Sequence, residues 1–275
     1  MIPPQFDYTR AETVEEALSV LAEHGDEAKV LAGGHSLIPL LKLRLASPMV
    51  LVDVGQIADL SYIREDGDHI AIGAGTTHHA VATSELLRSQ VPLLAHATGE
   101  VGDPQVRSRG TLGGALAHGD PAADHPATLL ALRGSVVVQG PAGRREIAAD
   151  DLFTGFLETA INPDELLVEV RVPKMPGAGW SFQKFNRRAQ DWAIVGVAAV
   201  VDNGNSGIAL VNMGSAPQRA AAVEAALSSG SSAADAAAVA DEGFDPPNDL
   251  NADEAYRRHL ARVLVGRALA EAGAS

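Results

Sequence analysis

Near the start of the chain, apolar residues recur at the spacing of an amphipathic helix. Leu18 and Leu21 lie on one predicted face, and Thr13-Val-Glu-Glu16 forms a capping box at which the helix would begin. Gly25 tolerates the left-handed conformation in which many helices end. The pattern therefore predicts an α-β-loop-α-β unit of about fifty residues, with strands over 29–32 and 48–54 and, between them, the loop Gly33-Gly34-His35-Ser36 and a helix from Ser36, as N-cap, to Leu45.

The middle of the chain continues as mixed α/β, with glycine and proline at the connections. Asp66-Gly67-Asp68 is a favourable turn sequence, so a hairpin is predicted around it. A second hairpin is predicted around Pro141-Ala-Gly143. Between the hairpins, the pattern predicts helices over 83–87 and 92–98, and a further helix that follows a glycine-rich stretch and runs through Leu132.

After Asn162-Pro163, a run of strands is followed by a run of alanine-rich helices. Asn251-Ala-Asp-Glu254 predicts a capping box for the last helix. Strands and helices segregated in this way are typical of an antiparallel sheet covered by helices, so we predict an α+β fold with a domain boundary near 160–175. The predicted strands cover 166–172, 180–185, 192–201 and 208–213, and the predicted helices cover 219–227, 233–240 and 253–270.

Composition narrows the class of protein. The 275 residues are 46% hydrophobic and include no cysteine, which excludes disulfides, thiolate zinc sites and iron–sulfur clusters within the chain. A net charge of −14 argues against a nucleic-acid groove, which needs a basic surface. The apolar runs are about half as long as a membrane span. Because the N-terminus shows no secretory signal, we expect a cytoplasmic protein.

Common catalytic motifs are absent, and two glycine loops remain as candidates for ligand binding. The sequence has no P-loop, nucleophile elbow or zincin motif. In Gly33-Gly34-His35-Ser36, paired glycines can turn backbone amides towards a phosphate, and the serine adds a hydroxyl. Gly110-Thr-Leu-Gly-Gly114 offers the same chemistry. A tight turn is the simpler explanation of either loop alone, and the presence of two such loops in one domain is what favours anion binding.

Two polar clusters allow both a structural and a functional interpretation. His118, Asp120, Asp124 and His125 have residue types that bind metals, but such residues beside turns often only cap helices, and we predict no metal site. A second cluster lies between two predicted strands. It forms either a polar connection or a cation and an aromatic ring beside a planar cofactor, and it contains Lys184, Arg187, Arg188, Asp191 and Trp192.

Three segments together resemble the FAD-binding medium subunits of the molybdenum hydroxylases. They are AGGHSLIPLLKLRLASPMVLVDVG, RGTLGGALAHGDPAADHPA and KFNRRAQDWAIVGVA. The resemblance covers essentially the whole chain and favours the aerobic carbon monoxide dehydrogenase branch, with the flavin domain of xanthine dehydrogenase as a more distant relative. It implies a PCMH-type FAD-binding domain over 1–165, with subdomains of about 1–55 and 56–165, and a C-terminal α+β domain over 166–275.

The resemblance also implies the site, position by position. Residues of the first loop would contact the FAD diphosphate, the second loop would form another flavin contact, and Asp124 would bond FAD hydroxyls. Ala115 departs from the asparagine of the xanthine dehydrogenase pattern, which favours the carbon monoxide dehydrogenase branch. The implied cofactor-binding residues are Ala32, Gly33, Gly34, His35, Ser36, Thr111, Leu112, Gly113, Gly114, Ala115, Asp124, Leu167, Lys184 and Trp192.

The same resemblance implies partner chains and an electron-transfer role. A large subunit would hold the molybdenum cofactor and a small one the [2Fe–2S] clusters, as a dimer of heterotrimers. FAD in this chain would pass electrons to a quinone, NAD or oxygen, and no residue of this chain is expected to be catalytic. The alternatives are a flavin subunit of an N-heterocycle or aldehyde dehydrogenase, a flavin-free assembly subunit, and a stand-alone flavin oxidoreductase.

Overall fold

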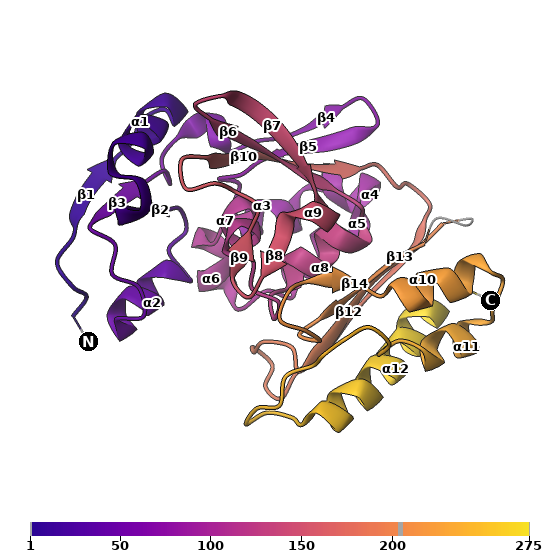
Figure 1. Cartoon of the computed structure of the whole chain (residues 1–275). Helices are drawn as coiled ribbons and strands as arrows, with labels where there is room; N and C mark the ends of the chain where they lie inside the picture. The colour runs from indigo at the N-terminus through magenta and orange to yellow at the C-terminus, as the bar shows by residue number, and fades with distance from the viewer. Residues whose placement is uncertain (1, 203–205, 275) are drawn as a thin grey trace.

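A three-stranded parallel sheet forms the N-terminal subdomain of the computed structural model, which describes residues 2–202 and 206–274 (Figure 1). The first helix begins as predicted, because the Thr13 hydroxyl accepts a hydrogen bond from the Glu16 amide at 3.1 Å. The first strand was not predicted, since three of its four residues are exposed and its sequence, DYTR, lacks a run of apolar residues. In the order β1-β3-β2, the strands are β1 (Asp7–Arg10), β3 (Val50–Asp53) and β2 (Ala28–Leu31), with helices α1 (Val14–His24) and α2 (Leu37–Leu43).

A five-stranded antiparallel sheet forms the second subdomain, in the order β4-β5-β10-β6-β7. Both predicted hairpins are confirmed as β4–β5 and β6–β7. The strand over 166–172 was predicted to belong to the C-terminal sheet, and that prediction is wrong, because β10 lies between the two hairpins and pairs with β5 and β6. The strands are β4 (Ile63–Asp66), β5 (His69–Gly73), β10 (Leu166–Pro173), β6 (Ser135–Gly140) and β7 (Gly143–Ala148).

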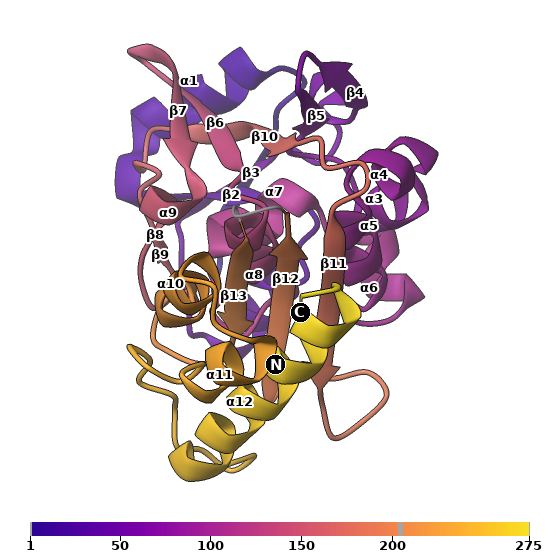
Figure 2. The same ribbon diagram turned by 90° about the vertical axis from the view of Figure 1, so that its right-hand side faces the viewer.

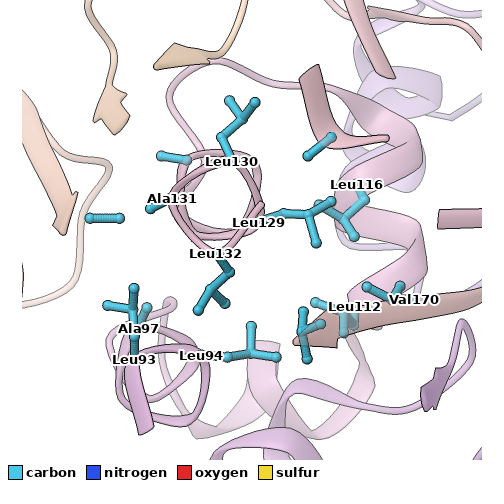
Figure 3. Packing of buried hydrophobic residues seen from close by; sticks show 14 of the residues in the cluster. Leu93, Leu94, Ala97, Leu112, Leu116, Leu129, Leu130, Ala131, Leu132 and Val170 are labelled. Atoms are coloured by element: carbon cyan, nitrogen blue, oxygen red, sulfur yellow. The ribbon is translucent and has the colours of Figure 1, made fainter. Parts of the chain in front are cut away.

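Short helices cover one side of this sheet, and one of them lies at the centre of the molecule. All eight residues of α8 are buried. Figure 3 shows α8 nearly end-on, with Leu129 pointing towards Leu116 of α7, and Leu132, directly after the helix, pointing towards α5. The elements of this layer are α3 (His78–Thr83), α4 (Glu85–Gln90), α5 (Pro92–Gly99), α6 (Pro104–Arg109), α7 (Leu112–His118), α8 (Asp124–Ala131) and α9 (Ala149–Leu152), with the small hairpin β8 (Phe153–Gly155) and β9 (Glu158–Thr159).

The C-terminal domain is the predicted antiparallel sheet covered by helices. Helices α10 to α12 cover one face of the sheet (Figure 2), and α5 and α8 pack on the other face. Burial on both faces explains the unbroken apolar sequence of the strand that begins at Val195. The elements are β11 (Gly179–Phe185), β12 (Val195–Val201), β13 (Gly207–Val211), β14 (Gln218–Arg219), α10 (Ala221–Ser228), α11 (Ala233–Ala238) and α12 (Glu254–Glu271).

Two local predictions in this domain need correction. The N-cap of α12 is Asp253, whose carboxylate accepts from the Tyr256 amide at 2.7 Å, so the predicted box starting at Asn251 is wrong by two positions. The strand predicted from residue 192 starts only at Val195, which leaves Trp192 in the preceding loop. In the described part of the chain, no helix has both the length and the apolar character needed to cross a membrane.

Candidate functional site

The two glycine loops, far apart in the sequence, lie against each other in the structure. A Cβ atom added to Gly33 would be 2.3 Å from the carbonyl oxygen of Arg109 and 2.7 Å from the Cα atom of Gly110. Only a residue without a side chain permits two backbones to approach so closely. The contact continues along the second loop, since a Cβ atom on Gly114 would be 3.8 Å from the Ala32 side chain. The glycines thus bring both predicted loops into one place.

The first loop, over 32–36, presents backbone amides that the protein leaves available. Among the described residues, no acceptor pairs with the amides from Gly33 to Ser36. Gly34 has φ of +77°, a conformation that favours glycine, and its carbonyl accepts from the Ile38 amide at 3.0 Å. His35 and Ser36 are exposed, and the Ser36 hydroxyl does not cap α2. Consecutive free amides of this kind form a nest that suits an anion.

The second loop, over 110–115, uses its amides inside the protein. It was expected to repeat the chemistry of the first loop, and for the amides that expectation is wrong. What remains accessible is the surface formed by exposed Gly114 and half-buried Ala115. The Leu112 and Gly113 amides donate to the carbonyls of Thr76 and Ala74 at 3.0 and 2.9 Å, the Gly114 amide donates to Thr111 Oγ1 at 3.1 Å, and the Ala115 amide donates to the Thr111 carbonyl at 3.0 Å.

Asp124 and Lys184, both predicted site residues, form a buried ion pair. Lys184 Nζ lies 2.7 Å from Asp124 Oδ2 and also donates to the Glu100 carbonyl at 3.0 Å, and the two charged side chains are only 7% and 6% exposed. Asp124 Oδ1 is buried without a hydrogen-bond partner among the described residues. Burial raises the pKa of Asp124 to about 6, although the charge of Lys184 opposes the rise. One carboxylate oxygen is therefore available to a hydroxyl donor.

Two further predicted site residues, Leu167 and Trp192, differ in their surroundings: Leu167 is buried and Trp192 is exposed. Leu167 is 5% exposed and belongs to the hydrophobic cluster that also holds Leu112 of α7. Trp192 is 65% exposed in the β11–β12 loop, where its amide donates to the Asp191 carboxylate at 3.0 Å. Leu167 therefore belongs to the core that also holds the start of α7, whereas the ring of Trp192 is open to solvent.

Sequence reasoning missed a pair of histidines beside these residues. His78 lies in the first turn of α3, which Thr77 caps by accepting from the Ala80 amide at 3.3 Å. The ring of His78, however, is buried and stacked on the ring of His125, with 4.5 Å between the ring centroids. The two residues lie on different helices, and no motif or periodicity in the sequence links them.

The histidine and aspartate cluster around residue 120 is divided among the end of α7, the turn that follows it and the start of α8. Asp124 is the first residue of α8, as predicted, and Asp120 Oδ1 accepts from the Ala122 amide at 2.8 Å. In the part of the chain that the structure describes, no three His, Asp or Glu side chains lie close enough together to hold a metal ion.

These donors and acceptors fit an extended ligand that has an anionic centre and hydroxyl groups. The nest over 33–36 suits a diphosphate, and its glycine cradle would be filled by a Cβ atom at Gly33. The unpartnered Asp124 Oδ1 suits a sugar or polyol hydroxyl. FAD carries a diphosphate and hydroxyl groups of both kinds, so the residues fit this cofactor.

Comparison with known proteins agrees with this interpretation. Residues 4–175 match the family model described as FAD binding domain in molybdopterin dehydrogenase, and residues 180–272 match that of the CO dehydrogenase flavoprotein C-terminal domain. The carbon monoxide dehydrogenase medium chain of Hydrogenophaga pseudoflava is 41% identical, with 98% of this chain and 97% of the relative covered. A 6-hydroxypseudooxynicotine dehydrogenase complex subunit alpha of Paenarthrobacter nicotinovorans is also 41% identical, with 99% and 96% covered.

A solved structure extends the similarity to the fold. The carbon monoxide dehydrogenase structure from Hydrogenophaga pseudoflava, in a form that lacks the Mo-pyranopterin moiety, superposes with a TM-score of 0.96. The match has 42% identity and covers 99% of this chain and 98% of that chain. The α+β architecture inferred from the sequence is confirmed.

Proposed function

Because this chain belongs to the family of FAD-binding subunits of molybdopterin dehydrogenases, we propose that it holds FAD where the two glycine loops meet, for electron transfer between partner subunits and an external acceptor. The contact between the loops carries the proposal, since it places the free amides over 33–36 beside the second loop and its helix. When bound, FAD supplies the redox chemistry. The protein binds and orients it.

Each part of the site has a distinct task in this proposal. The amides over 33–36 hold the diphosphate, with the hydroxyl of Ser36 beside them. Thr111 Oγ1 fixes the second loop, so that the accessible face of Gly114 and Ala115 lies against the cofactor. Asp124 Oδ1 accepts from a cofactor hydroxyl, while Lys184 holds Oδ2. Trp192 covers the flavin ring, and Leu167 supports the second loop. His35 and Ala32 complete the walls, while the buried Leu112 and Gly113 hold the second loop in place through their amides.

An electron relay explains why this chain contains no cysteine. Iron–sulfur clusters need thiolate ligands, so the clusters that deliver electrons must belong to another chain. We propose a small partner subunit with [2Fe–2S] clusters and a large partner subunit with the molybdenum cofactor, assembled as a dimer of heterotrimers. The relatives named as a medium chain and as a complex subunit support this assembly.

Ser36 offers a sharp test of the diphosphate site. Aspartate is a favourable N-cap residue, so Ser36→Asp should leave α2 intact while placing a negative charge beside the free amides. Ser36→Asn is the matched control, because it has nearly the same shape and capping ability without the charge. We expect Ser36→Asp to weaken FAD binding at least about tenfold and Ser36→Asn to stay within about threefold. Flavin fluorescence quenching on the full chain measures both.

Equal FAD affinity of the two variants would contradict a diphosphate at 33–36. A wild-type preparation that shows no flavin absorbance and releases no FAD in acid would contradict flavin binding itself and favour the assembly-subunit alternative. Activity of the chain expressed alone would instead favour a stand-alone oxidoreductase.

We propose carbon monoxide as the substrate of the complex, oxidised in the large subunit. The carbon monoxide dehydrogenase medium chain supports this choice, but the equally similar subunit of the 6-hydroxypseudooxynicotine enzyme makes an N-heterocyclic substrate the second candidate. The complex purified with its partners distinguishes the two. Carbon monoxide alone should bleach the flavin absorbance under anaerobic conditions, whereas bleaching by 6-hydroxypseudooxynicotine alone would identify the second candidate as correct.

A further inference from the structure

The stacked imidazoles of His78 and His125 form a buried bridge beneath the proposed flavin site. Their ring planes are inclined by only 19°, and the residues are 5% and 2% exposed. His78 begins α3 and His125 is the second residue of α8, so the stack joins two helices of the second subdomain. Stacked aromatic rings keep a narrow range of separations, which suits them to hold two elements at a set distance.

One end of this bridge contacts the second glycine loop. The His78 amide donates to the Gly110 carbonyl at 2.8 Å. A Cβ atom on Gly110 would lie only 2.7 Å from His78 Cδ2, so the imidazole packs directly on the Gly110 backbone. Gly110 is also the residue that Gly33 of the first loop approaches. A displacement of His78 would therefore reach both glycine loops.

The other end of the bridge is joined to the carboxylate of the site. His125 follows Asp124 on α8, and its Nε2 lies 3.2 Å from Thr98 Oγ1. The only hydroxyl proton of Thr98 goes to the Leu94 carbonyl at 2.7 Å, so His125 Nε2 must be the donor. Thr98 thereby fixes the ring orientation, and with it the start of the helix that carries Asp124.

The surroundings of both rings favour their neutral forms. Burial, together with the charges of His35 and Arg107, lowers the pKa of His78 to about 4. Burial also places the pKa of His125 well below its ordinary 6.5, helped by His78 and by Lys184. The carboxylate of Asp124, the nearest acid on α8, forms an ion pair with Lys184. A proton on either ring would thus meet cationic neighbours.

We infer that the His78–His125 stack is a spacer that sets the distance between the second glycine loop and Asp124, and so shapes the flavin site. Both histidines are positioning residues. They act through the Gly110 backbone and the start of α8, and they do so as neutral rings. This inference rests on the proposed location of FAD, and it predicts that loss of the spacer weakens FAD binding without unfolding the chain.

Four proteins test the spacer: the full-length wild type, His78→Ala, His78→Phe and His79→Ala. His79 is the matched control, because it is the next residue of the same helix turn and its side chain is exposed. We expect His78→Ala to weaken FAD binding about tenfold at pH 7, and His78→Phe, which keeps an aromatic ring in the stack, to stay within about threefold. His79→Ala should match the wild type.

A pH profile separates a neutral spacer from simple packing. Below pH 5, protonation of His78 should weaken FAD binding in the wild type, in a step centred near the His78 pKa of about 4. His78→Phe should lack this step. The change due to Asp124, whose pKa is about 6, occurs at higher pH and should remain in both proteins. Far-UV circular dichroism at each pH shows whether the chain is still folded.

Two outcomes would overturn the spacer: FAD binding by His78→Ala within twofold of the wild type, or an unchanged low-pH step in His78→Phe. A variant that fails to fold is replaced by Gly110→Ala, which presses on the same ring and should weaken FAD binding comparably. Absence of FAD binding in the wild type would contradict the proposed function, and it is therefore distinguishable from failure of the spacer alone.

Discussion

The first and second glycine loops have similar sequences, yet their backbone amides differ in hydrogen bonding. In the first loop the amides from Gly33 to Ser36 find no acceptor among the described residues. In the second loop the amides from Leu112 to Ala115 are all bonded within the protein. One loop is thus an open nest, and the other is a folded support on which the nest rests.

The difference shows that glycine serves two separate purposes in this site. Gly34 supplies a positive φ that turns the first loop and leaves its amides free. Gly110 and Gly113 supply close approach, because Cβ atoms there would collide with His78 and Ala74. Glycine therefore supplies a turn with free amides at Gly34 and permits tight packing at Gly33, Gly110 and Gly113.

The largest expected effect comes from separating the loops. Gly33→Ala places a Cβ atom 2.3 Å from the carbonyl oxygen of Arg109. This oxygen belongs to the backbone, so it cannot move aside as the end of a flexible side chain could. We expect a loss of about 3 kcal/mol in the free energy of unfolding, together with loss of FAD. Gly99→Ala is the control, because nothing lies within 4 Å of its added Cβ atom, and its stability should change little. Urea unfolding of both variants measures the difference.

Equal stability of Gly33→Ala and Gly99→Ala would contradict the close contact between the two loops at Gly33.

A smaller, pH-dependent effect is expected at the ion pair beside the second loop. Lys184→Met should cost about 2 kcal/mol at pH 8 and clearly less at pH 5, because Asp124 is largely protonated there and the pair is already weakened. Lys174→Met is the control. Its ammonium pairs with the exposed Glu65 at 2.6 Å, and such surface pairs contribute about 0.5 kcal/mol or less. Chemical unfolding at the two pH values gives both numbers.

The sign of this pH dependence follows from proton linkage. The pKa of Asp124 is about 6 in the fold, above its ordinary 3.8, so the folded chain holds this proton more tightly than the unfolded chain. The contribution of Asp124 to stability is complete below pH 3.8 and is lost as the pH rises through 6. Lys184 limits that loss. A cost of Lys184→Met that grows towards low pH would contradict the assignment.

The smallest effect is expected within the second loop. Thr111→Val removes the hydroxyl that caps α7 and should cost about 1 kcal/mol, because one amide loses its acceptor. Thr13→Val removes the equivalent cap of α1, far from the loop contact, and should cost a similar amount. FAD affinity should change less than about threefold in both. A strong loss of FAD in Thr111→Val alone would contradict this expectation and show that FAD binding depends on the Thr111 hydroxyl.

Sequence patterns predicted the elements whose residues bury one clear face. The helix capped by Thr13 and the hairpin at Gly67 are examples, because each depends on neighbours close in the chain. The strand Asp7–Arg10 was not predicted, because most of its residues are exposed. The strand Leu166–Pro173 was recognised as a strand but misplaced, since its apolar sequence suits the middle of either sheet.

The candidate site could be proposed from sequence where a motif is continuous, and not where side chains meet across helices. Local sequence singled out the loop over 32–36, and resemblance added Asp124. The hydrogen bonds that occupy the second loop come from Ala74 and Thr76, and the stack joins His78 to His125. These contacts depend on how helices pack, which single-sequence patterns do not contain.

The position of β10 has a consequence for how the chain must be made. Its two neighbours, β5 and β6, are synthesised before it. Each of them therefore has one edge that lacks its final partner strand until Leu166–Pro173 leaves the ribosome. At usual translation rates the interval from β5 to β10 is roughly 5–20 s. A fragment that ends at residue 165 would keep those edges permanently and invite aggregation. The flavin-binding half of this protein thus matures only as its last strand arrives.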